Sequence, residues 1–180
     1  DITPTMGVEV LKERVGAMGG DFDTVLEGLR RVLGDRVMIT GLVSREGDRL
    51  YTSLVAISKE GILSRRAAIN QGLPIFEEGE KPEPWEIRGK RFLIYTSYEA
   101  SKTTKLDGEM IHVVLGLGGA GVETPGLSIH LSTYPREIPR PSPWAIYSSI
   151  SFGGETLALG PSPDGLFSMD LEGLVEKFYG

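Results

Sequence analysis

Short apolar segments, each about as long as one β-strand and separated by brief turns, dominate this sequence. Five of them are the clearest candidates for strands: 37–44, 50–58, 91–96, 110–115 and 144–151. A doubly wound parallel sheet needs a helix between most of its strands, and the sequence does not provide those helices. The pattern therefore predicts an α+β fold, in which helices pack on a largely antiparallel or mixed sheet, or on two sheets that lie face to face.

Residues 21–33 form the most convincing helical segment. Asp21 or Asp23 is available as the N-cap, and Gly34 is suited to end the helix. Helical spacing places five apolar residues on one face, namely Phe22, Val25, Leu26, Leu29 and Leu33.

The rest of the chain alternates between turns, strands and polar loops. Residues 62–72 are predicted as a strand or an irregular segment, and 73–85 as a loop rich in Pro, Glu and Gly. A hairpin is expected from Trp85, with Gly89 and Lys90 as its turn, and 97–108 is compatible with a short helix.

Length and charge restrict the organisation and the partners. With 180 residues and no recognisable linker, we expect a single domain over 1–180. The net charge of −6, without a basic cluster, argues against binding to nucleic acid or to an anionic membrane surface. Apolar stretches have strand length and the first residues lack the features of a signal peptide, so we expect a cytoplasmic protein.

The residue types that are rare or absent limit the chemistry. The chain has no Cys, one Asn and one Gln, a depletion typical of thermophile proteins. His112 lies in the apolar run "MIHVVLGL" and is interpreted as a hydrogen-bonded core residue. Its spacing from His130 does not suit a shared metal ion, so we expect no metal and no cofactor.

One glycine motif resembles a nucleotide-binding signature. Residues 116–121, "GLGGAG", fit G-x-G-x-x-G and follow a predicted strand. The following "VETPG" contains Pro125 and Gly126, so no helix begins where a pyrophosphate would need the positive end of its dipole. We interpret the motif as a loop.

Several ordered segments resemble the carbon–nitrogen hydrolase family, which includes the nitrilases and amidases. They are "GLVSREGDRLYTSLVAISKEGIL", "FEEGEKPEPWEIRGKRFLIYTSYEAS", "EMIHVVLGL", "WAIYSSISFGGETL" and "DGLFSMDLEGL". The resemblance covers roughly residues 37 to 176 and implies the family's four-layer αββα sandwich, in a shortened form. The family's long helix after the "V-V-L" strand is replaced here by the proline-broken segment 118–144.

The resemblance also implies a catalytic triad that this chain lacks. Family members use Glu as a general base, Lys to stabilise the oxyanion and Cys as the nucleophile. Ser97 matches the Cys position, Ala68 lies at or near the Lys position, and we expect the segment that would carry the Glu to be deleted. Serine is a nucleophile only when a base takes its proton.

These departures predict a non-catalytic binding or assembly protein, which forms homo-oligomers or pairs with a related subunit. One alternative is a residual amide or ester hydrolase, with Ser97 as nucleophile and Glu99, Glu77 or Glu78 as base. Another is a sensor that binds a small molecule in a remnant pocket. The residues expected in that pocket are Ser97, Tyr98, Glu99, Arg65, Arg66 and Glu77.

Overall fold

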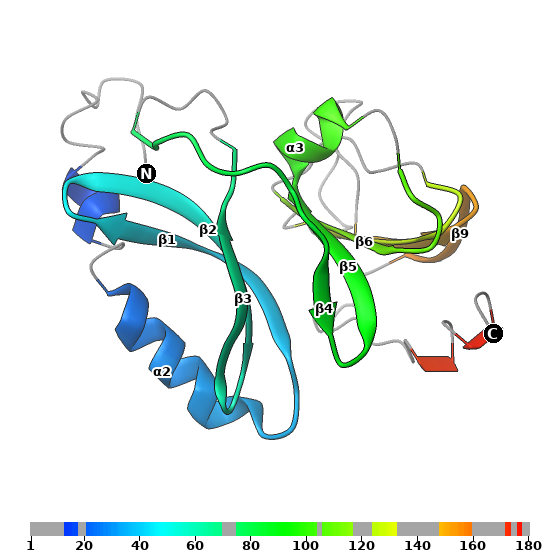
Figure 1. The fold of residues 1–180 in the computed structure, drawn as a ribbon, viewed down its shortest axis with the longest axis horizontal. Coiled ribbons are helices and arrows are strands. Elements are labelled where there is room, and N and C mark those ends of the chain that lie inside the picture. Colours follow the sequence, from blue (N-terminus) through cyan, green and yellow to red (C-terminus); the bar gives the residue numbers. More distant parts are fainter. Residues whose placement is uncertain are drawn as a thin grey trace. The chain divides into compact units, whose positions relative to one another are not determined.

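The computed structural model (Figure 1) describes residues 13–17, 21–69, 75–103, 106–116, 124–132, 148–159, 172–173 and 176–177. The chain divides into two compact units, unit 1 over 1–82 and unit 2 over 83–180. Each unit is described by itself below, and the single domain over 1–180 stays a prediction.

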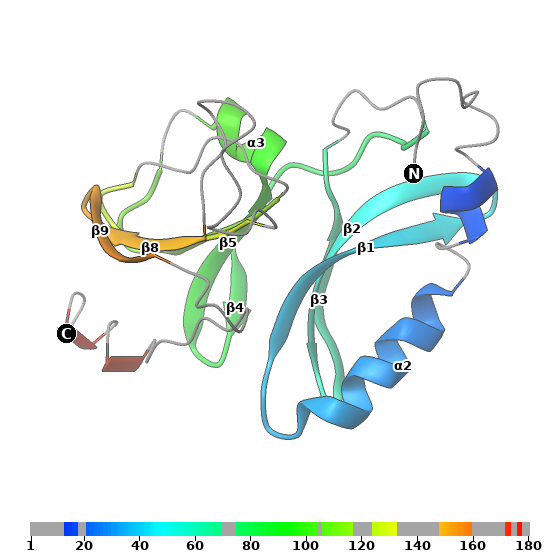
Figure 2. The ribbon, with the colours of Figure 1, turned by 180° about the vertical axis from the view of Figure 1, so that it is seen from behind.

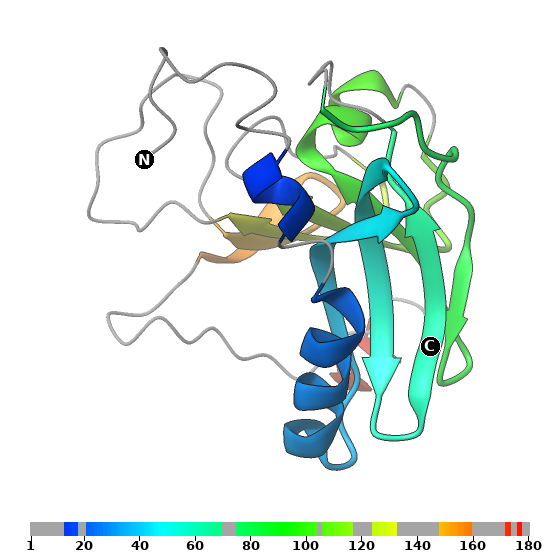
Figure 3. The same cartoon turned by 90° about the vertical axis from the view of Figure 1, so that its left-hand side faces the viewer.

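Unit 1 contains a three-stranded antiparallel sheet and one long helix. The strands β1 (Met38–Glu46), β2 (Arg49–Ser58) and β3 (Gly61–Ala67) lie in the order β1-β2-β3. Helix α2 (Phe22–Leu33) runs along this sheet (Figure 3). Its buried side chains and those of β2 form the core of the unit: Phe22, Leu26, Leu33, Val55 and Ile57.

The predicted helix is confirmed, with two differences in detail. Asp21 is the N-cap residue, but its side chain makes no capping hydrogen bond. Gly34 ends the helix with a φ of 55°, a conformation that favours glycine. Val25 was expected on the buried face but is 40% exposed, because the buried stripe follows positions 22, 26, 29 and 33.

Unit 2 is built on a six-stranded mixed sheet in the order β4-β5-β6-β7-β8-β9. Its strands are β4 (Trp85–Ile87), β5 (Lys90–Thr96), β6 (Ile111–Gly116), β7 (Leu127–Ser132), β8 (Ser149–Phe152) and β9 (Glu155–Leu159). The three central strands β5, β6 and β7 are parallel to one another, and the outer pairs are antiparallel. Figure 2 shows β8 and β9 from the other side of the molecule. The fold class is therefore α+β with two sheets, as predicted.

Strand β7 was missed by the sequence analysis, which treated 118–144 as a proline-broken replacement for a helix. Leu127, Ile129 and Leu131 alternate with polar residues, which is the pattern of a strand with two different faces. Because Gly and Pro residues lie on both sides of this short alternating pattern, the whole segment was interpreted as irregular. Of the predicted strand 144–151, residues 144–147 lie outside the described part, as does all of the glycine motif except Gly116 and all of the proline-rich stretch 135–143.

The hairpin between β4 and β5 is confirmed, but its turn lies one residue earlier than predicted. Ile87 pairs with Lys90, so Arg88 and Gly89 are the two turn residues. Their φ angles are 53° and 72°, as a two-residue turn of type I′ requires. Lys90 therefore begins β5 and is not part of the turn.

Candidate functional site

The elbow between β5 and α3 (Ser97–Lys102) positions the serine that the sequence analysis singled out. Thr96 is the N-cap of α3, and its Oγ1 accepts a hydrogen bond from the Glu99 backbone N at 3.3 Å. In return, Glu99 Oε2 accepts from the Thr96 backbone N at 2.7 Å. This capping box starts the helix directly after the strand and fixes Ser97 as its first residue. The signal T-x-x-E was present in the sequence but was not used to predict the helix start.

The hydroxyl of Ser97 is buried against Gly116 at the end of β6. A methyl group on Gly116 would lie 1.5 Å from Ser97 Oγ and 2.8 Å from Ser97 Cβ, so this contact requires glycine. Although Ser97 as a residue is partly exposed, its Oγ is buried and has no hydrogen-bond partner in the described part of the chain. The elbow therefore holds the hydroxyl in a buried position next to the β6 backbone.

The two residues after Ser97, Tyr98 and Glu99, each make a contact of their own. Glu99 is only 2% exposed and its carboxylate is engaged by the Thr96 backbone, as described above. Tyr98 is 36% exposed, and the Lys102 ammonium lies 5.5 Å from the centre of its ring. The Glu99 carboxylate is therefore part of the capping box of α3.

His112 on β6 is a hydrogen-bonded core residue, as predicted. It is fully buried, its Nδ1 lies 3.3 Å from the Tyr95 hydroxyl, and its Nε2 donates to the Asp107 carbonyl oxygen at 2.8 Å. The rings of Tyr95 and His112 are stacked with centroids 5.9 Å apart. Burial lowers the pKa of His112, and the Asp107 carbonyl opposes this by favouring the protonated ring.

His130 on β7 is buried without the partners that His112 has. It pairs with Val114 of β6 and Ser149 of β8 in the sheet register and is 4% exposed. Neither Nδ1 nor Nε2 has a hydrogen-bond partner among the described residues. Burial lowers the pKa of His130 to about 4, so the ring is neutral at physiological pH. The sequence analysis considered His130 only as a metal ligand and did not predict this environment.

Ser97 and His130 lie on the same face of the unit 2 sheet. Side chains alternate along a strand, and the Gly116 methyl position that meets Ser97 is on the same side as Val114. Val114 packs with Tyr95 and with Ala100 of α3, so this is the face that α3 covers. Since Ser97 Oγ and both ring nitrogens of His130 are without partners, the two side chains do not hydrogen-bond to each other.

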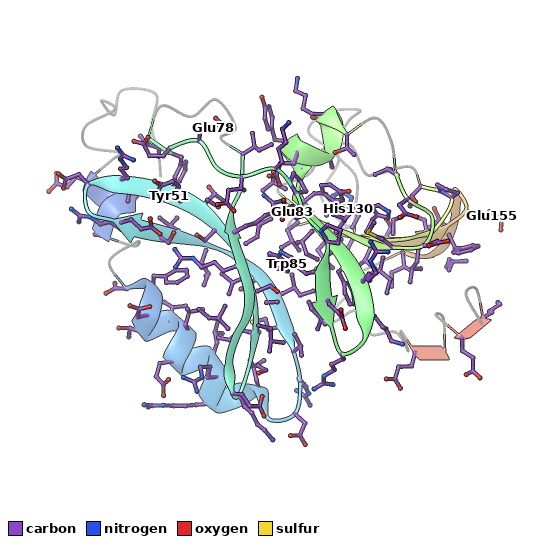
Figure 4. The ribbon with its side chains drawn as sticks, viewed as in Figure 1. Tyr51, Glu78, Glu83, Trp85, His130 and Glu155 are labelled. Carbon is purple, nitrogen blue, oxygen red and sulfur yellow. The ribbon has the colours of Figure 1, made fainter. Side chains whose placement is uncertain are left out.

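Unit 1 contains a polar pocket of about 430 Å³, which we call the β3 pocket. Its lining includes Arg65, Arg66, Tyr51, Glu46 and Glu78. Tyr51 belongs to β2, and Glu78 belongs to the segment after β3; both are labelled in Figure 4. Two hydrogen bonds hold that segment, from the Glu77 backbone N to the Leu50 carbonyl at 2.8 Å and from the Glu80 backbone N to the Ala67 carbonyl at 2.9 Å.

Ala68, at or near the expected Lys position, is buried and closely packed by backbone. It is 2% exposed, and its backbone N donates to the Thr52 carbonyl oxygen at 2.7 Å. A methyl group on Gly79 would lie 2.0 Å from the Ala68 carbonyl oxygen, so the segment after β3 crosses this residue at close range. The space around Ala68 is therefore occupied by backbone.

The six residues of the predicted remnant pocket divide between the two units. Arg65 and Arg66 line the β3 pocket of unit 1, whereas Glu77 does not and its neighbour Glu78 does. The other three residues, Ser97, Tyr98 and Glu99, belong to unit 2. A common pocket for all six stays a prediction. Among the described residues, no group of three or more His, Asp or Glu side chains is arranged to hold a metal ion.

Comparison with known proteins adds to this description at the level of the fold. No family model matches the sequence, and no curated protein matches it. Solved structures do match. A CN-hydrolase superfamily protein from Xanthomonas campestris, with an arsenic adduct in its active site, gives a TM-score of 0.61 at 10% identity. That match covers 88% of this chain and 71% of the other.

Two further structures support the same fold. Nit3 from Saccharomyces cerevisiae, a member of branch 10 of the nitrilase superfamily, gives a TM-score of 0.56 at 11% identity, covering 86% of this chain and 69% of Nit3. The glutamine-dependent NAD+ synthetase from Acinetobacter baumannii gives a TM-score of 0.56 at 15% identity, and the match covers 80% of this chain. The chain spans only 32% of the length of that synthetase.

Two sheets, few helices in the described part and a strand-to-helix elbow define the class of this protein as a mixed α+β fold. The fold is that of the nitrilase, or carbon–nitrogen hydrolase, superfamily. In the described part of the chain, no helix has the length and apolar character needed to cross a membrane.

Proposed function

We propose that this chain is a non-catalytic binding or assembly protein built on the nitrilase fold. The observation that carries the proposal is the environment of Ser97. Its hydroxyl is buried against Gly116, and no described side chain lies within hydrogen-bonding distance to take its proton. An unassisted serine hydroxyl does not ionise near neutral pH, so this arrangement does not activate a nucleophile.

The two side chains that come closest to a base role argue in the same direction. Glu99 accepts a hydrogen bond from the Thr96 backbone, and moving its carboxylate to serve Ser97 would break one of the two hydrogen bonds of the capping box of α3. His130 shares a face of the sheet with Ser97 but makes no hydrogen bond to it. With a pKa of about 4, His130 is also a weak proton acceptor.

The position that corresponds to the family's lysine supports the proposal as well. Ala68 has no charge to stabilise an oxyanion, and the carbonyl oxygen of Ala68 is packed against Gly79. Arg65 and Arg66 provide positive charge nearby in the sequence, but an arginine does not replace the compact ammonium of lysine. The test is a hydrolysis assay of the wild type beside the Ser97→Ala variant on amides, nitriles and activated esters, which is developed at the end of the Discussion.

Assembly is supported by apolar side chains on the surface of unit 1. Val32 of α2 is 72% exposed, and Ile62 and Leu63 of β3 are 46% and 45% exposed. Exposed apolar surface of this kind favours association with a second copy or a related subunit. Light scattering is expected to show a dimer or larger, and a monomer at high protein concentration would contradict assembly without affecting the binding role.

A further inference from the structure

The β3 pocket of unit 1 has the size and the polar groups of a small-molecule site. Its volume of about 430 Å³ falls within the range of about 300–1,000 Å³ that is usual for such sites. Ser97 is not among its lining residues. Ala67 lines the pocket, whereas Ala68 is not among its lining residues.

Arg65 provides the positive charge of this pocket and is held in a defined orientation. Its guanidinium lies 4.6 Å from the centre of the Phe22 ring, and its Nη2 lies 3.4 Å from Glu46 Oε1. Stacking on an aromatic ring leaves the edge of the guanidinium available to donate hydrogen bonds in its plane. Because the bond to Glu46 is long, most of the donor capacity of Arg65 remains for an anionic group such as a carboxylate.

Arg66 has a different role, because its side chain is used by the protein itself. It is 5% exposed, and its Nη1 donates to the carbonyl oxygens of Ala67 and Glu80 at 3.3 Å and 3.1 Å. These bonds attach the segment after β3 to the strand. Arg66 therefore shapes the pocket, and we assign recognition of a ligand to Arg65.

Negative charge and a free hydroxyl complete the lining. Glu78 makes no hydrogen bond or ion pair within the described part of the chain, and neither does the Tyr51 hydroxyl. Glu46 uses Oε1 for Arg65 and keeps Oε2 as an acceptor. Carboxylates of this kind bind an ammonium group, and the Tyr51 hydroxyl can donate to a carboxylate beside Arg65.

The pocket thus presents opposite charges to a single small volume. An anion alone would meet Arg65 but also the carboxylates of Glu46 and Glu78. A cation alone would leave most of the hydrogen-bond donors of Arg65 unused. We propose that the β3 pocket binds a small zwitterion of the amino-acid class, with its carboxylate at Arg65 and Tyr51 and its ammonium at Glu46 and Glu78.

This inference rests on the proposed function in one respect, because it names the ligand class of a binding protein. It is tested by titrating 4-aminobutyrate, butylamine and butyrate into the ¹⁵N-labelled protein and following the amide signals of Tyr51, Arg65 and Gly79 by NMR. The three probes share one carbon chain and differ only in their charged ends. We expect 4-aminobutyrate to bind at least about tenfold more tightly than either single-charge analogue.

Variants assign each end of the zwitterion to its partner. Arg65→Gln is expected to lower the affinity for 4-aminobutyrate to that for butylamine. Glu78→Gln is expected to lower it to that for butyrate. Tyr51→Phe removes only the hydroxyl and should give a smaller loss. Arg31→Gln is the matched control, because Arg31 is an exposed arginine of α2 that pairs with Glu27 and does not line the pocket.

Three outcomes would overturn the inference: no saturable shift with 4-aminobutyrate, equal affinity for all three probes, or unchanged affinity in Arg65→Gln. Denaturant unfolding of each variant shows that a loss of binding is not a loss of fold. A failure here would leave the hydrolysis assay on Ser97 unaffected. Turnover that depends on Ser97 would contradict the proposed function without removing the zwitterion site, so the two failures are distinguishable.

Discussion

Ser97 and Gly116 are packed so closely that a methyl group on Gly116 would lie 1.5 Å from the serine hydroxyl oxygen. The contact joins the start of α3 to the end of β6, and it places the hydroxyl in a buried position without a partner among the described residues. The same contact holds the Ser97 side chain at the elbow between β5 and α3.

The first prediction concerns this contact. Gly116→Ala should destabilise the protein by about 1–3 kcal/mol, because overpacking forces Ser97 or the strand to move. Ser97→Gly in the same chain removes both Oγ and Cβ and should recover most of that loss. Urea unfolding of the wild type, both single variants and the double variant measures the coupling. Additive effects in the double variant would show that the two residues do not share this contact.

The second prediction concerns the two buried histidines. The nitrogens of His130 have no described partner, so His130→Leu should leave stability at neutral pH unchanged or raise it by about 1 kcal/mol. The matched variant His112→Leu should be destabilising, because it removes the hydrogen bonds that the ring makes with the Tyr95 hydroxyl and the Asp107 carbonyl. Equal losses in both variants would mean that His130 has partners of comparable strength.

The pH dependence of stability follows from the lowered pKa of His130. In the unfolded chain the ring protonates near pH 6.5, whereas in the folded chain it stays neutral down to about pH 4. The unfolded state therefore binds more protons between these values, and stability falls as the pH is lowered through this window. A pKa that falls from 6.5 to about 4 corresponds to about 3 kcal/mol. His130→Leu should lose this part of the pH dependence, and an unchanged profile between pH 6.5 and 4 would contradict the assignment.

The third prediction compares two glycines in unit 1. A methyl group on Gly79 would lie 2.0 Å from the Ala68 carbonyl oxygen, whereas one on Gly28 in α2 meets nothing within 4 Å. Gly79→Ala should therefore be destabilising, since backbone has to move. Gly28→Ala should stabilise by about 0.5–1 kcal/mol through helix propensity. Thermal unfolding of both variants would show the opposite signs, and a tolerated Gly79→Ala would mean that the crossing over Ala68 is loose.

Much of the fold could be predicted from local patterns. Apolar periodicity predicted α2, turns that contain Gly predicted the hairpins of unit 1, and buried apolar runs predicted the strands β5 and β6. Strand β7 was missed because its alternation is short and lies between Gly and Pro residues. The turn at Arg88 was placed one residue late, because a non-glycine residue with a φ of 53° is not expected from sequence.

The site was less predictable, because it depends on contacts between distant segments. The position of Ser97 on the elbow followed from the resemblance, but its burial against Gly116 depends on how β6 aligns with β5. Likewise, no local pattern indicates that His112 has hydrogen-bond partners and that His130 has none among the described residues. Arg65 was predicted as a pocket residue, whereas its stacking on Phe22 requires α2 to pack on the sheet.

The most direct test of the central claim is a comparison of the wild type with Ser97→Ala and His130→Leu on propionamide, propionitrile and p-nitrophenyl acetate, at moderate and elevated temperature. Because the Ser97 hydroxyl has no hydrogen-bond partner among the described residues, we expect background rates that are the same in all three proteins. Glu99→Gln, which keeps an acceptor oxygen for the Thr96 backbone, should likewise change nothing. Turnover by the wild type that is lost in Ser97→Ala would show that Ser97 is a nucleophile and would contradict the account.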